Sequence, residues 1–255
     1  MHAHHDVATS LIWEFIALSQ CPCFHCRDVA PRHDVTFALA HFSNVVKISP
    51  KFPIDKACLL SCGISTGIGT AWKVADIEEG TVGLAVAEAA RLRGASKIIG
   101  VDLIQEKMEI GKKFGVTHFI NPMTCGEKKF SEMIKEITDG GADYCFERIG
   151  LASLMEDAFN SSRVNWGKTV ILGLEMHRTP LAINTSLLLR GRTVIGCLFG
   201  GLKPKSGIPF LAQKYRHKEL NLDGFKNQEV GFGDINKALD SLLEGKSLRC
   251  IMRMD

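Results

Sequence analysis

Apolar and polar residues follow one another in the order helix, strand, helix, strand along most of the chain, and this order is clearest from residue 83 onward. Apolar side chains recur at helical spacing in GLAVAEAARLRG, and the apolar run KIIGVD that follows has the length of a strand. The pattern then repeats, and it predicts helices at 107–114, 130–141, 151–163 and 185–191, separated by strands in THFINP, ADYCFERIG, KTVILGLE and RTVIGCLFGG. Strands that alternate with helices predict a parallel, doubly wound α/β sheet.

The segments on either side are less regular. NVVKISP predicts a short strand closed by Pro50. Residues 52–77 predict helical pieces broken at the glycines. Near the other end, apolar residues within 235–243 fall on one helical face, Gly245 ends that helix, and a last short strand follows. Residues 1–36 are rich in His and Cys and lack sustained periodicity, so we predict a disordered leader there.

Composition narrows the class of protein. Of the 255 residues, 45% are hydrophobic and 23% are charged, which is ordinary for a globular protein. The 31 basic and 28 acidic residues are spread along the chain without a clustered Lys/Arg face, so we expect no nucleic-acid partner. No apolar run approaches the roughly 18 residues of a membrane span, so we expect no membrane partner. Nine irregularly spaced cysteines, most within apolar runs, favour a reducing compartment, and the cytoplasm is the expected location.

Gly83 and Asp102 have the spacing of two parts of a nucleotide-binding unit. Gly83 precedes a helix, a strand follows, and Asp102 comes about 20 residues after the glycine. A carboxylate there accepts hydrogen bonds from both hydroxyls of an adenosine ribose and repels a 2′-phosphate, which favours NAD over NADP. The alternative is that Asp102 only begins the next turn or helix. The residues from 75 to 80 do not supply the buried strand and glycine turn of a full fingerprint.

Several motifs in one order resemble the medium-chain, zinc-dependent alcohol dehydrogenases, with the plant class as the nearest match. They are LLSCGISTGIGTAWKVADIEEG, GLAVAEAARLRGASKIIGVD, FGVTHFINP and GRTVIGCLFGG. The resemblance implies a cytosolic dimer with a GroES-like catalytic domain, then a Rossmann NAD-binding domain, and a last segment that returns to the catalytic domain. On that basis we expect an unmatched leader over 1–36, a remnant of the catalytic domain with its connecting helix over 37–75, a Rossmann-like domain over 76–200 and a C-terminal return segment over 201–255.

The same resemblance implies roles for individual residues. Cys62 would be one ligand of a catalytic zinc, and Thr66 would lie against the nicotinamide. Asp102 and Lys107 would hold the adenosine ribose. Three groups of cofactor contacts complete the set: Gly83 at the helix start, Arg249 at the pyrophosphate, and Ile149, Leu172, Leu174 and Phe199 along the cofactor cleft.

Each of these roles has a structural alternative. Thr66 can bond its own helix backbone, Lys107 can be a solvated helix residue, and Arg249 can pair with a surface carboxylate. The four apolar residues of the cleft would be packed in any fold. Cys62 can be a small buried residue in an apolar helix, as most free cysteines are.

A catalytic zinc needs three protein ligands and an open position. The other two ligands of the resembled family lie in C-x-[ST]-D and G-H-E segments, and neither motif occurs in this sequence. We therefore expect that the catalytic zinc is not retained. CPCFHC does not have the spacing of the family's structural zinc lobe, and the alternatives there are an unstructured leader or an improvised zinc site built from Cys21, Cys23, Cys26 and His33.

The resemblance also implies that a segment between Gly80 and Val82 is missing, which in relatives carries the first Rossmann strand and the first two glycines. That strand lies at the centre of the sheet, so its loss would leave two half-sheets. In an alternative arrangement TVGLAV becomes a strand, and the helix begins later, at about Ala87. Both arrangements lack a glycine turn at the pyrophosphate, so we expect NAD binding to be weak or lost.

Two functional hypotheses follow. The first is an impaired NAD-dependent alcohol dehydrogenase, because the resembled family oxidises primary alcohols to aldehydes with catalytic zinc; its small-molecule partner would be an alcohol or aldehyde. The second is a non-catalytic, truncated remnant that binds nucleotide weakly, or that forms a homodimer or a heterodimer with a full-length relative through its VIGCLFGG strand. A zinc-free reductase of the same superfamily would still need an intact glycine turn.

Overall fold

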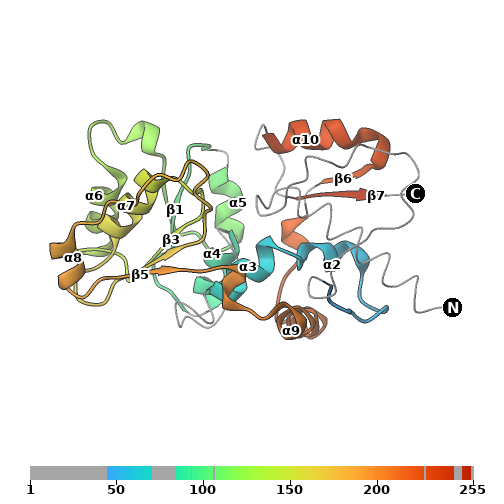
Figure 1. The fold of residues 1–255 in the computed structure, drawn as a ribbon. Helices are drawn as coiled ribbons and strands as arrows, with labels where there is room; N and C mark the ends of the chain where they lie inside the picture. Colours follow the sequence, from blue (N-terminus) through green and yellow to red (C-terminus); the bar gives the residue numbers. More distant parts are fainter. Residues whose placement is uncertain are drawn as a thin grey trace. The chain divides into compact units, whose positions relative to one another are not determined.

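The computed structural model describes residues 45–70, 84–92, 94–105, 107–226, 228–243 and 249–253. The chain divides into a larger unit, Gly63–Lys203, and a smaller unit made of Met1–Cys62 and Pro204–Asp255 (Figure 1). The expected domain boundary between residues 75 and 76 lies outside the described residues. None of the helices in the described ranges is long and apolar enough to cross a membrane.

The larger unit alternates helix and strand as the sequence predicts. Its helices are α3 (Gly63–Gly69), α4 (Leu84–Leu92), α5 (Lys107–Lys113), α6 (Phe130–Thr138), α7 (Ala152–Ser161) and α8 (Thr185–Leu189). Its strands are β1 (Ile99–Val101), β2 (His118–Ile120), β3 (Tyr144–Glu147), β4 (Lys168–Ile171) and β5 (Thr193–Gly196). Every pairing among these strands is parallel, which confirms the predicted α/β class.

The parallel strands of the larger unit form two separate sheets within the described residues. β1 pairs with β2, and β4 lies between β3 and β5, with Val170 opposite both Phe146 and Ile195. Among the described strands, no pairing joins β1 to β3. The sequence analysis expected two half-sheets because of the loss of a central strand. Residues 71–83, where that strand would belong, lie outside the described part of the chain.

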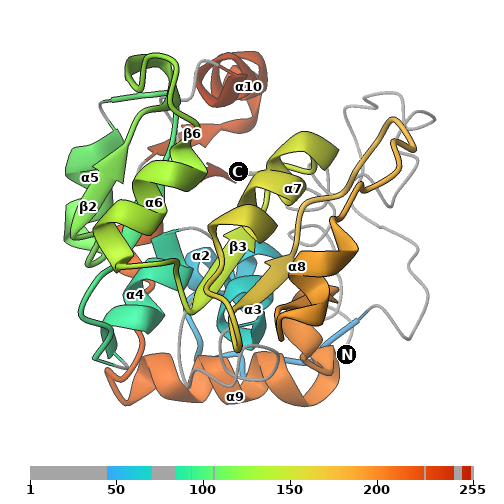
Figure 2. The same cartoon turned by 90° about the vertical axis from the view of Figure 1, so that its left-hand side faces the viewer.

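Helices cover the three-stranded sheet on the face that carries its core. α7 packs on β3 and β4, and α6 packs beside α7, so that both helices lie in front of β3 in Figure 2. Met155 and Phe159 of α7 are buried, and Val170 of the central strand is fully buried. This core fixes β3 and β4 relative to each other, and therefore also fixes the loops that follow them.

Two expectations for the start of the described fold were wrong. α4 begins at Leu84, so the alternative in which the helix starts at about Ala87 does not hold for residues 84–86. The five described residues from Val45 form no strand; a turn follows them instead, in which the amide of Phe52 donates to the carbonyl oxygen of Ser49 at 2.9 Å. A short β-branched run becomes a strand only where a neighbouring strand pairs with it.

The prediction of helical pieces broken at the glycines needs a correction at Gly67, which does not interrupt α3. Gly67 lies inside the helix, whereas Gly63 is its first residue and Gly69 its last. A Cβ added to Gly69 would lie 2.3 Å from the carbonyl oxygen of Gly200, so another backbone approaches the helix closely there. Gly69 therefore stands at the end of α3, where the lack of a side chain permits this close packing.

The smaller unit contains α2 (Ile54–Leu59), α9 (Pro204–Arg216), β6 (Gln228–Gly231), α10 (Ile235–Leu243) and β7 (Cys250–Arg253). α10 and β7 are the predicted last helix and strand. The sequence analysis predicted neither α9 nor β6. Pro209 lies inside α9, and an internal proline argues against a helix when only the sequence is considered. β6 pairs with β7 in parallel.

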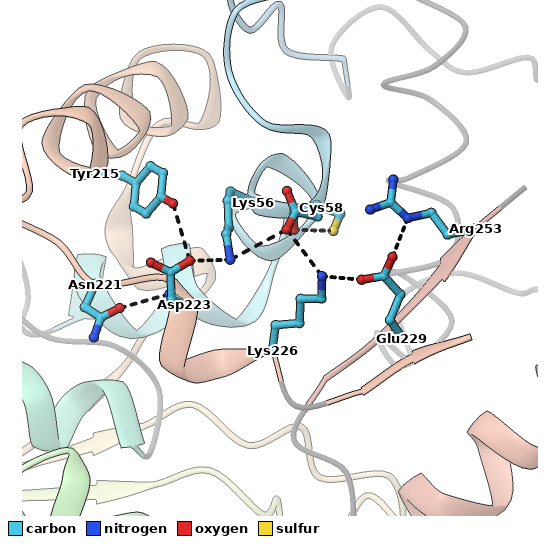
Figure 3. A network of polar contacts seen from close by, with 9 residues as sticks. Lys56, Cys58, Tyr215, Asn221, Asp223, Lys226, Glu229 and Arg253 are labelled. Atoms are coloured by element: carbon cyan, nitrogen blue, oxygen red, sulfur yellow. Dashed lines mark hydrogen bonds and ion pairs between the residues drawn. The ribbon is translucent and has the colours of Figure 1, made fainter. Parts of the chain in front are cut away.

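A network of charged side chains joins the elements of the smaller unit (Figure 3). Lys56 of α2 forms ion pairs with Asp223 and Asp55. Lys226 contacts Asp55 at 3.5 Å and also pairs with Glu229 of β6. Burial acts to lower the pKa of Lys56, but the hydrogen bond and charge of Asp223 outweigh it and raise that pKa above its usual value.

Arg253 of β7 completes this network through its Nε atom, which lies 2.5 Å from Oε1 of Glu229. Glu229 therefore binds a cation with each of its carboxylate oxygens. The hydrogen bonds from Lys226 and Arg253 lower the pKa of Glu229 to about 2. The network thus connects α2, β6 and β7, which come from opposite ends of the chain.

Candidate functional site

Asp102 lies directly after β1, at the carboxyl end of the two-stranded sheet. Its Oδ1 atom accepts a hydrogen bond from the amide of Ile104 at 3.0 Å, so the side chain closes a short turn. Lys107, the first residue of α5, places its Nζ atom 3.0 Å from Oδ2 of Asp102. The Asp102 side chain is 22% exposed and that of Lys107 is 30% exposed, so the pair is open to a ligand. The structure thus brings together the two residues predicted to hold a ribose.

The loops that follow β3 and β4 lie against each other. A Cβ on Gly150 would lie 2.3 Å from the carbonyl oxygen of Leu174, and one on Gly173 would lie 2.1 Å from the amide nitrogen of Gly150. In these loops Ile149 is 63% exposed and Leu174 is 52% exposed, whereas Leu172 is half-buried. Two predicted cleft residues therefore present apolar surface at the carboxyl ends of the strands, where open α/β sheets bind ligands.

Glu147, the last residue of β3, holds both of these loops. Its backbone carbonyl accepts hydrogen bonds from the amides of Leu172 at 2.7 Å and Gly173 at 3.1 Å. Its side-chain Oε1 accepts from the amides of Ile149 at 2.7 Å and Gly150 at 2.9 Å. The sequence analysis did not single out this residue. The available signal was an acidic residue at the end of the apolar strand run YCFE, where a buried carboxylate needs backbone donors.

Thr66 of α3 lies beside the short 3-10 helix η5 (Phe199–Gly201). A Cβ on Gly200 would lie 2.2 Å from the carbonyl oxygen of Thr66, and that oxygen accepts a hydrogen bond from the hydroxyl of Thr70 at 2.6 Å. Phe199 has a φ of +51°, in the left-handed region that side chains rarely adopt. The structure therefore places the predicted nicotinamide residue Thr66 and the predicted cleft residue Phe199 in neighbouring segments.

Comparison with protein families identifies the group to which this arrangement belongs. A family model described as zinc-binding dehydrogenase matches residues 81–213, more than half of the 255-residue chain. The chain belongs to the zinc-binding dehydrogenase family. The match begins just before α4 and ends within α9, so it includes the strands of both sheets of the larger unit.

The curated relatives that the chain matches include alcohol dehydrogenase-like proteins and an alcohol dehydrogenase class-3 protein. The chain is 58% identical over 228 residues to alcohol dehydrogenase-like 1 of Arabidopsis thaliana and 42% identical over 228 residues to alcohol dehydrogenase class-3 of Oryza sativa subsp. japonica. Each match covers 86% of this chain, but only 59% and 60% of the respective relatives. The chain therefore spans well under two thirds of the length of the curated relatives it matches.

Solved structures of the same family share the fold. Benzyl alcohol dehydrogenase from Acinetobacter calcoaceticus matches with a TM-score of 0.73 and 30% identity, over 82% of this chain and 59% of that one. An alcohol dehydrogenase zinc-binding domain protein from Burkholderia ambifaria matches with a TM-score of 0.75 and 28% identity, over 86% of this chain and 61% of that one. These likenesses confirm the Rossmann-like fold and the predicted resemblance to zinc-dependent alcohol dehydrogenases.

Cys62, Arg249 and Gly83 complete the set of predicted site residues. Cys62 and Arg249 belong to the smaller unit, where Cys62 follows α2 in a turn, Arg249 immediately precedes β7, and both are half-buried. Gly83 lies outside the described residues. The roles of Cys62 as a zinc ligand, of Arg249 at the pyrophosphate and of Gly83 at the helix start stay predictions.

A catalytic zinc of the family would need a cluster of three ligands. In the described part of the chain, no three His, Cys, Asp or Glu side chains form a group that could hold a metal ion. Cys21, Cys23, Cys26 and His33 lie outside that part, so the improvised zinc site stays an untested alternative. The described side chains do not fit a catalytic zinc.

The thiols of Cys145, which is buried, and Cys58, which is half-buried, are also poorly suited to act as thiolates. Burial raises the pKa of Cys145 in β3 to about 12, and burial together with the charge of Asp55 raises the pKa of Cys58 in α2 to about 12. The thiol of Cys58 donates to the carbonyl oxygen of Asp55 at 3.0 Å. Because the thiolate is the nucleophile and the metal ligand, these raised pKa values disfavour both roles for the two cysteines.

Proposed function

We propose that this chain binds an NAD-type dinucleotide weakly along the carboxyl ends of β1, β3 and β4, as an alcohol dehydrogenase-like protein with impaired catalysis. The observation that carries the proposal is the pair of Asp102 and Lys107, which is partly exposed at the end of β1. A carboxylate at this place in a Rossmann-like fold accepts hydrogen bonds from ribose hydroxyls and disfavours a 2′-phosphate.

The loops after β3 and β4 would receive the other end of the dinucleotide. Ile149 and Leu174 offer apolar surface there, and Thr66 lies beside η5, which follows β5. When bound, NAD would supply the acceptor for a hydride taken from an alcohol. The residues described here bind and orient the cofactor by hydrogen bonding at Asp102 and by apolar contact at the two loops.

The expected affinity is low because the segment before α4 lacks a complete glycine turn. In full dinucleotide sites, the first two glycines let backbone amides approach the pyrophosphate at a helix start. Residues 75 to 80 read ADIEEG, a sequence without those two glycines, and its three acidic residues would repel phosphate. We expect a Kd for NADH weaker than about 100 μM, equivalent to a binding free energy of about −5.5 kcal/mol.

Turnover of alcohol is not expected, since we propose that the chain lacks the full ligand set of the family's catalytic zinc. Elemental analysis of the purified protein should give far less than one zinc per chain, and ethanol should produce no NADH from NAD. One zinc per chain together with ethanol-dependent NAD reduction would contradict this part of the proposal and support a working dehydrogenase.

The binding proposal is tested by titrating the protein with NADH and with NADPH while amide shifts are followed by NMR. NADH should shift the amides around residue 102 at sub-millimolar concentration, and NADPH should bind more weakly because Asp102 repels its 2′-phosphate. The substitution Asp102→Ala should weaken NADH binding and remove the preference over NADPH. Micromolar affinity for NADH would show that the pyrophosphate cradle is intact after all.

Glu109→Ala is the matched control for Asp102→Ala. Glu109 also pairs with a lysine of α5, since Nζ of Lys112 lies 2.7 Å from its carboxylate, but it lies within the helix rather than at the strand end. Removal of this pair changes the net charge by the same amount. If both substitutions reduced NADH affinity equally, the effect would be general electrostatics and not ribose recognition.

A second role, as a homodimer or as a partner for a full-length relative, is favoured by the edge of the three-stranded sheet. β5 pairs only with β4 among the described strands, and Leu198, which follows β5, is 87% exposed. We expect light scattering to show self-association that Leu198→Asp weakens. Leu103 follows β1 and is 62% exposed, and Leu103→Asp serves as the control. This variant should leave the molar mass measured by light scattering unchanged. A monomeric wild-type chain that also fails to bind a relative would exclude this role.

A further inference from the structure

Glu147 makes an unusual number of hydrogen bonds at the carboxyl end of β3. Its backbone carbonyl holds the loop after β4, and its Oε1 atom holds the loop after β3, through two amides in each case. One residue therefore fixes the backbones that carry Ile149 and Leu174, the two exposed apolar residues of the candidate site. The residue itself is only 5% exposed, so it cannot be a direct contact in the free protein.

The second side-chain oxygen, Oε2, is buried and accepts no hydrogen bond from any described residue. A buried carboxylate oxygen without a donor costs free energy, so stability alone does not explain why a glutamate stands here. What the carboxylate provides is a strong, charge-assisted anchor for the amides of Ile149 and Gly150. Rigid loops reduce the ordering cost of binding, which is a reason to keep such an anchor beside a ligand site.

We propose that Glu147 is the positioning residue for the nicotinamide end of the dinucleotide site. This inference rests on the proposed function. The Glu147 carboxylate fixes the loop of Ile149 directly. The backbone carbonyl of Glu147 binds the loop of Leu174, so the two groups together hold one loop against the other. Asp102, at the end of β1, contacts the adenosine end independently. Loss of the Glu147 carboxylate therefore weakens the nicotinamide end and spares the adenosine end.

The test compares NADH with AMP, which carries only the adenosine end, in NMR titrations of the wild type, Glu147→Gln and Glu147→Ala. NADH should bind wild type more tightly than AMP. Glu147→Ala should raise the Kd for NADH about tenfold and leave the Kd for AMP unchanged. Glu147→Gln, which keeps one carbonyl acceptor for the two amides, should restore part of the loss. In the free variants, the amides of Ile149 and Gly150 should exchange with solvent faster.

Glu175→Gln is the matched control. The Glu175 carboxylate also accepts hydrogen bonds from two backbone amides of its own loop, those of His177 and Thr179, but among the described residues no hydrogen bond joins it to the loop after β3. This variant should keep the wild-type affinities for both NADH and AMP. If Glu147→Ala does not fold, Glu147→Gln alone decides the question, because it preserves volume and should still lower NADH affinity about threefold.

The outcomes separate the inference from the function on which it rests. A wild-type chain that binds neither NADH nor AMP overturns both. Binding of both ligands by the wild type, with equal losses of NADH and AMP affinity in the Glu147 variants, would show a merely structural role and overturn the inference alone. Unchanged NADH affinity in both variants would do the same.

Discussion

Asp102 and Glu147 occupy equivalent places in the two half-sheets but are held in opposite ways. Asp102 directly follows β1 and Glu147 is the last residue of β3, and each carboxylate accepts hydrogen bonds from backbone amides of the loop at its strand end. Asp102 also binds a side-chain cation at a partly exposed site. The Glu147 side chain is buried, and its carboxylate accepts hydrogen bonds only from backbone amides among the described residues. Its other oxygen, Oε2, has no hydrogen-bond partner among those residues.

The difference indicates which carboxylate can contact a ligand and which can only orient others. A partly exposed ion pair contributes little to stability, so its hydrogen bonds can be exchanged for those of a ribose at small cost. Bonds from backbone amides to a buried carboxylate cannot be exchanged without loosening the loop. The carboxyl end of one sheet is therefore suited to direct contact, and that of the other to preorganised apolar surface.

The largest effect is expected where the two loops of the three-stranded sheet touch. Gly173→Ala would place a Cβ 2.1 Å from the amide nitrogen of Gly150, and backbone atoms cannot move aside as a flexible side chain can. We expect a loss of about 2–4 kcal/mol in the free energy of unfolding. Urea unfolding followed by circular dichroism measures it.

Gly196→Ala serves as the control for that substitution. Gly196 is the last residue of β5, and a Cβ there meets nothing within 4 Å. Its free energy of unfolding should change by less than about 0.5 kcal/mol. Equal losses at both positions would mean that the close contact between the loops is not a feature of the folded protein.

The next effect contrasts the two carboxylates themselves. Glu147→Ala removes two charge-assisted hydrogen bonds and relieves one buried unpartnered oxygen, so we expect a net loss of about 2 kcal/mol in stability. Asp102→Ala removes a partly exposed ion pair and one turn bond, with an expected loss below about 1 kcal/mol. Urea midpoints of the two variants decide the order, and the reverse order would contradict the assignment of the buried carboxylate as the anchor.

The sequence predicted the repeated part of the larger unit because helix and strand periodicities are local properties. KIIGVD and KTVILGLE show their strands without any knowledge of neighbours, and Asp102 stood out because it ends such a run. Glu147 ends one too, but its importance depends on the loop after β4, more than twenty residues away in sequence and adjacent only in the fold. The close approach of Gly69 to Gly200 and the helix α9 around Pro209 were missed for the same reason, since packing against distant segments outweighed local preference.

A third carboxylate, Glu229 of the smaller unit, extends the comparison to a fully paired case. Its hydrogen bonds with Lys226 and Arg253 lower its pKa from 4.5 to about 2. A depressed folded-state pKa stabilises the fold above pH 4.5, and this contribution is lost as pH falls toward 2. Glu229→Gln should therefore reduce the slope of the free energy of unfolding against pH between pH 4.5 and about 2. The same slope should be unchanged near neutral pH.

The acid experiment is measured by circular dichroism as a function of pH, with the titration of the Glu229 side chain followed by NMR. A Glu229 carboxyl that titrates near its ordinary value would contradict the network drawn in Figure 3. Glu109→Gln, which removes an exposed carboxylate of a simple i,i+3 pair, is the control and should leave the acid dependence nearly unaltered.

The smallest effect tests whether the two half-sheets open independently, using the thiols of Cys125 and Cys145 as reporters. Cys125 follows β2 and is half-buried, whereas Cys145 lies in β3 and is 8% exposed, with a pKa that burial raises to about 12. Alkylation of the native protein, followed by mass spectrometry, should modify Cys125 first, because labelling of Cys145 needs its sheet to open. Glu147→Ala should speed the labelling of Cys145 by about tenfold for each 1.4 kcal/mol of lost local stability, and should leave the rate at Cys125 unchanged. Equal acceleration at both cysteines would mean that the two sheets open as one cooperative unit. The two sheets would then share one free energy of opening although their strands are not paired with each other.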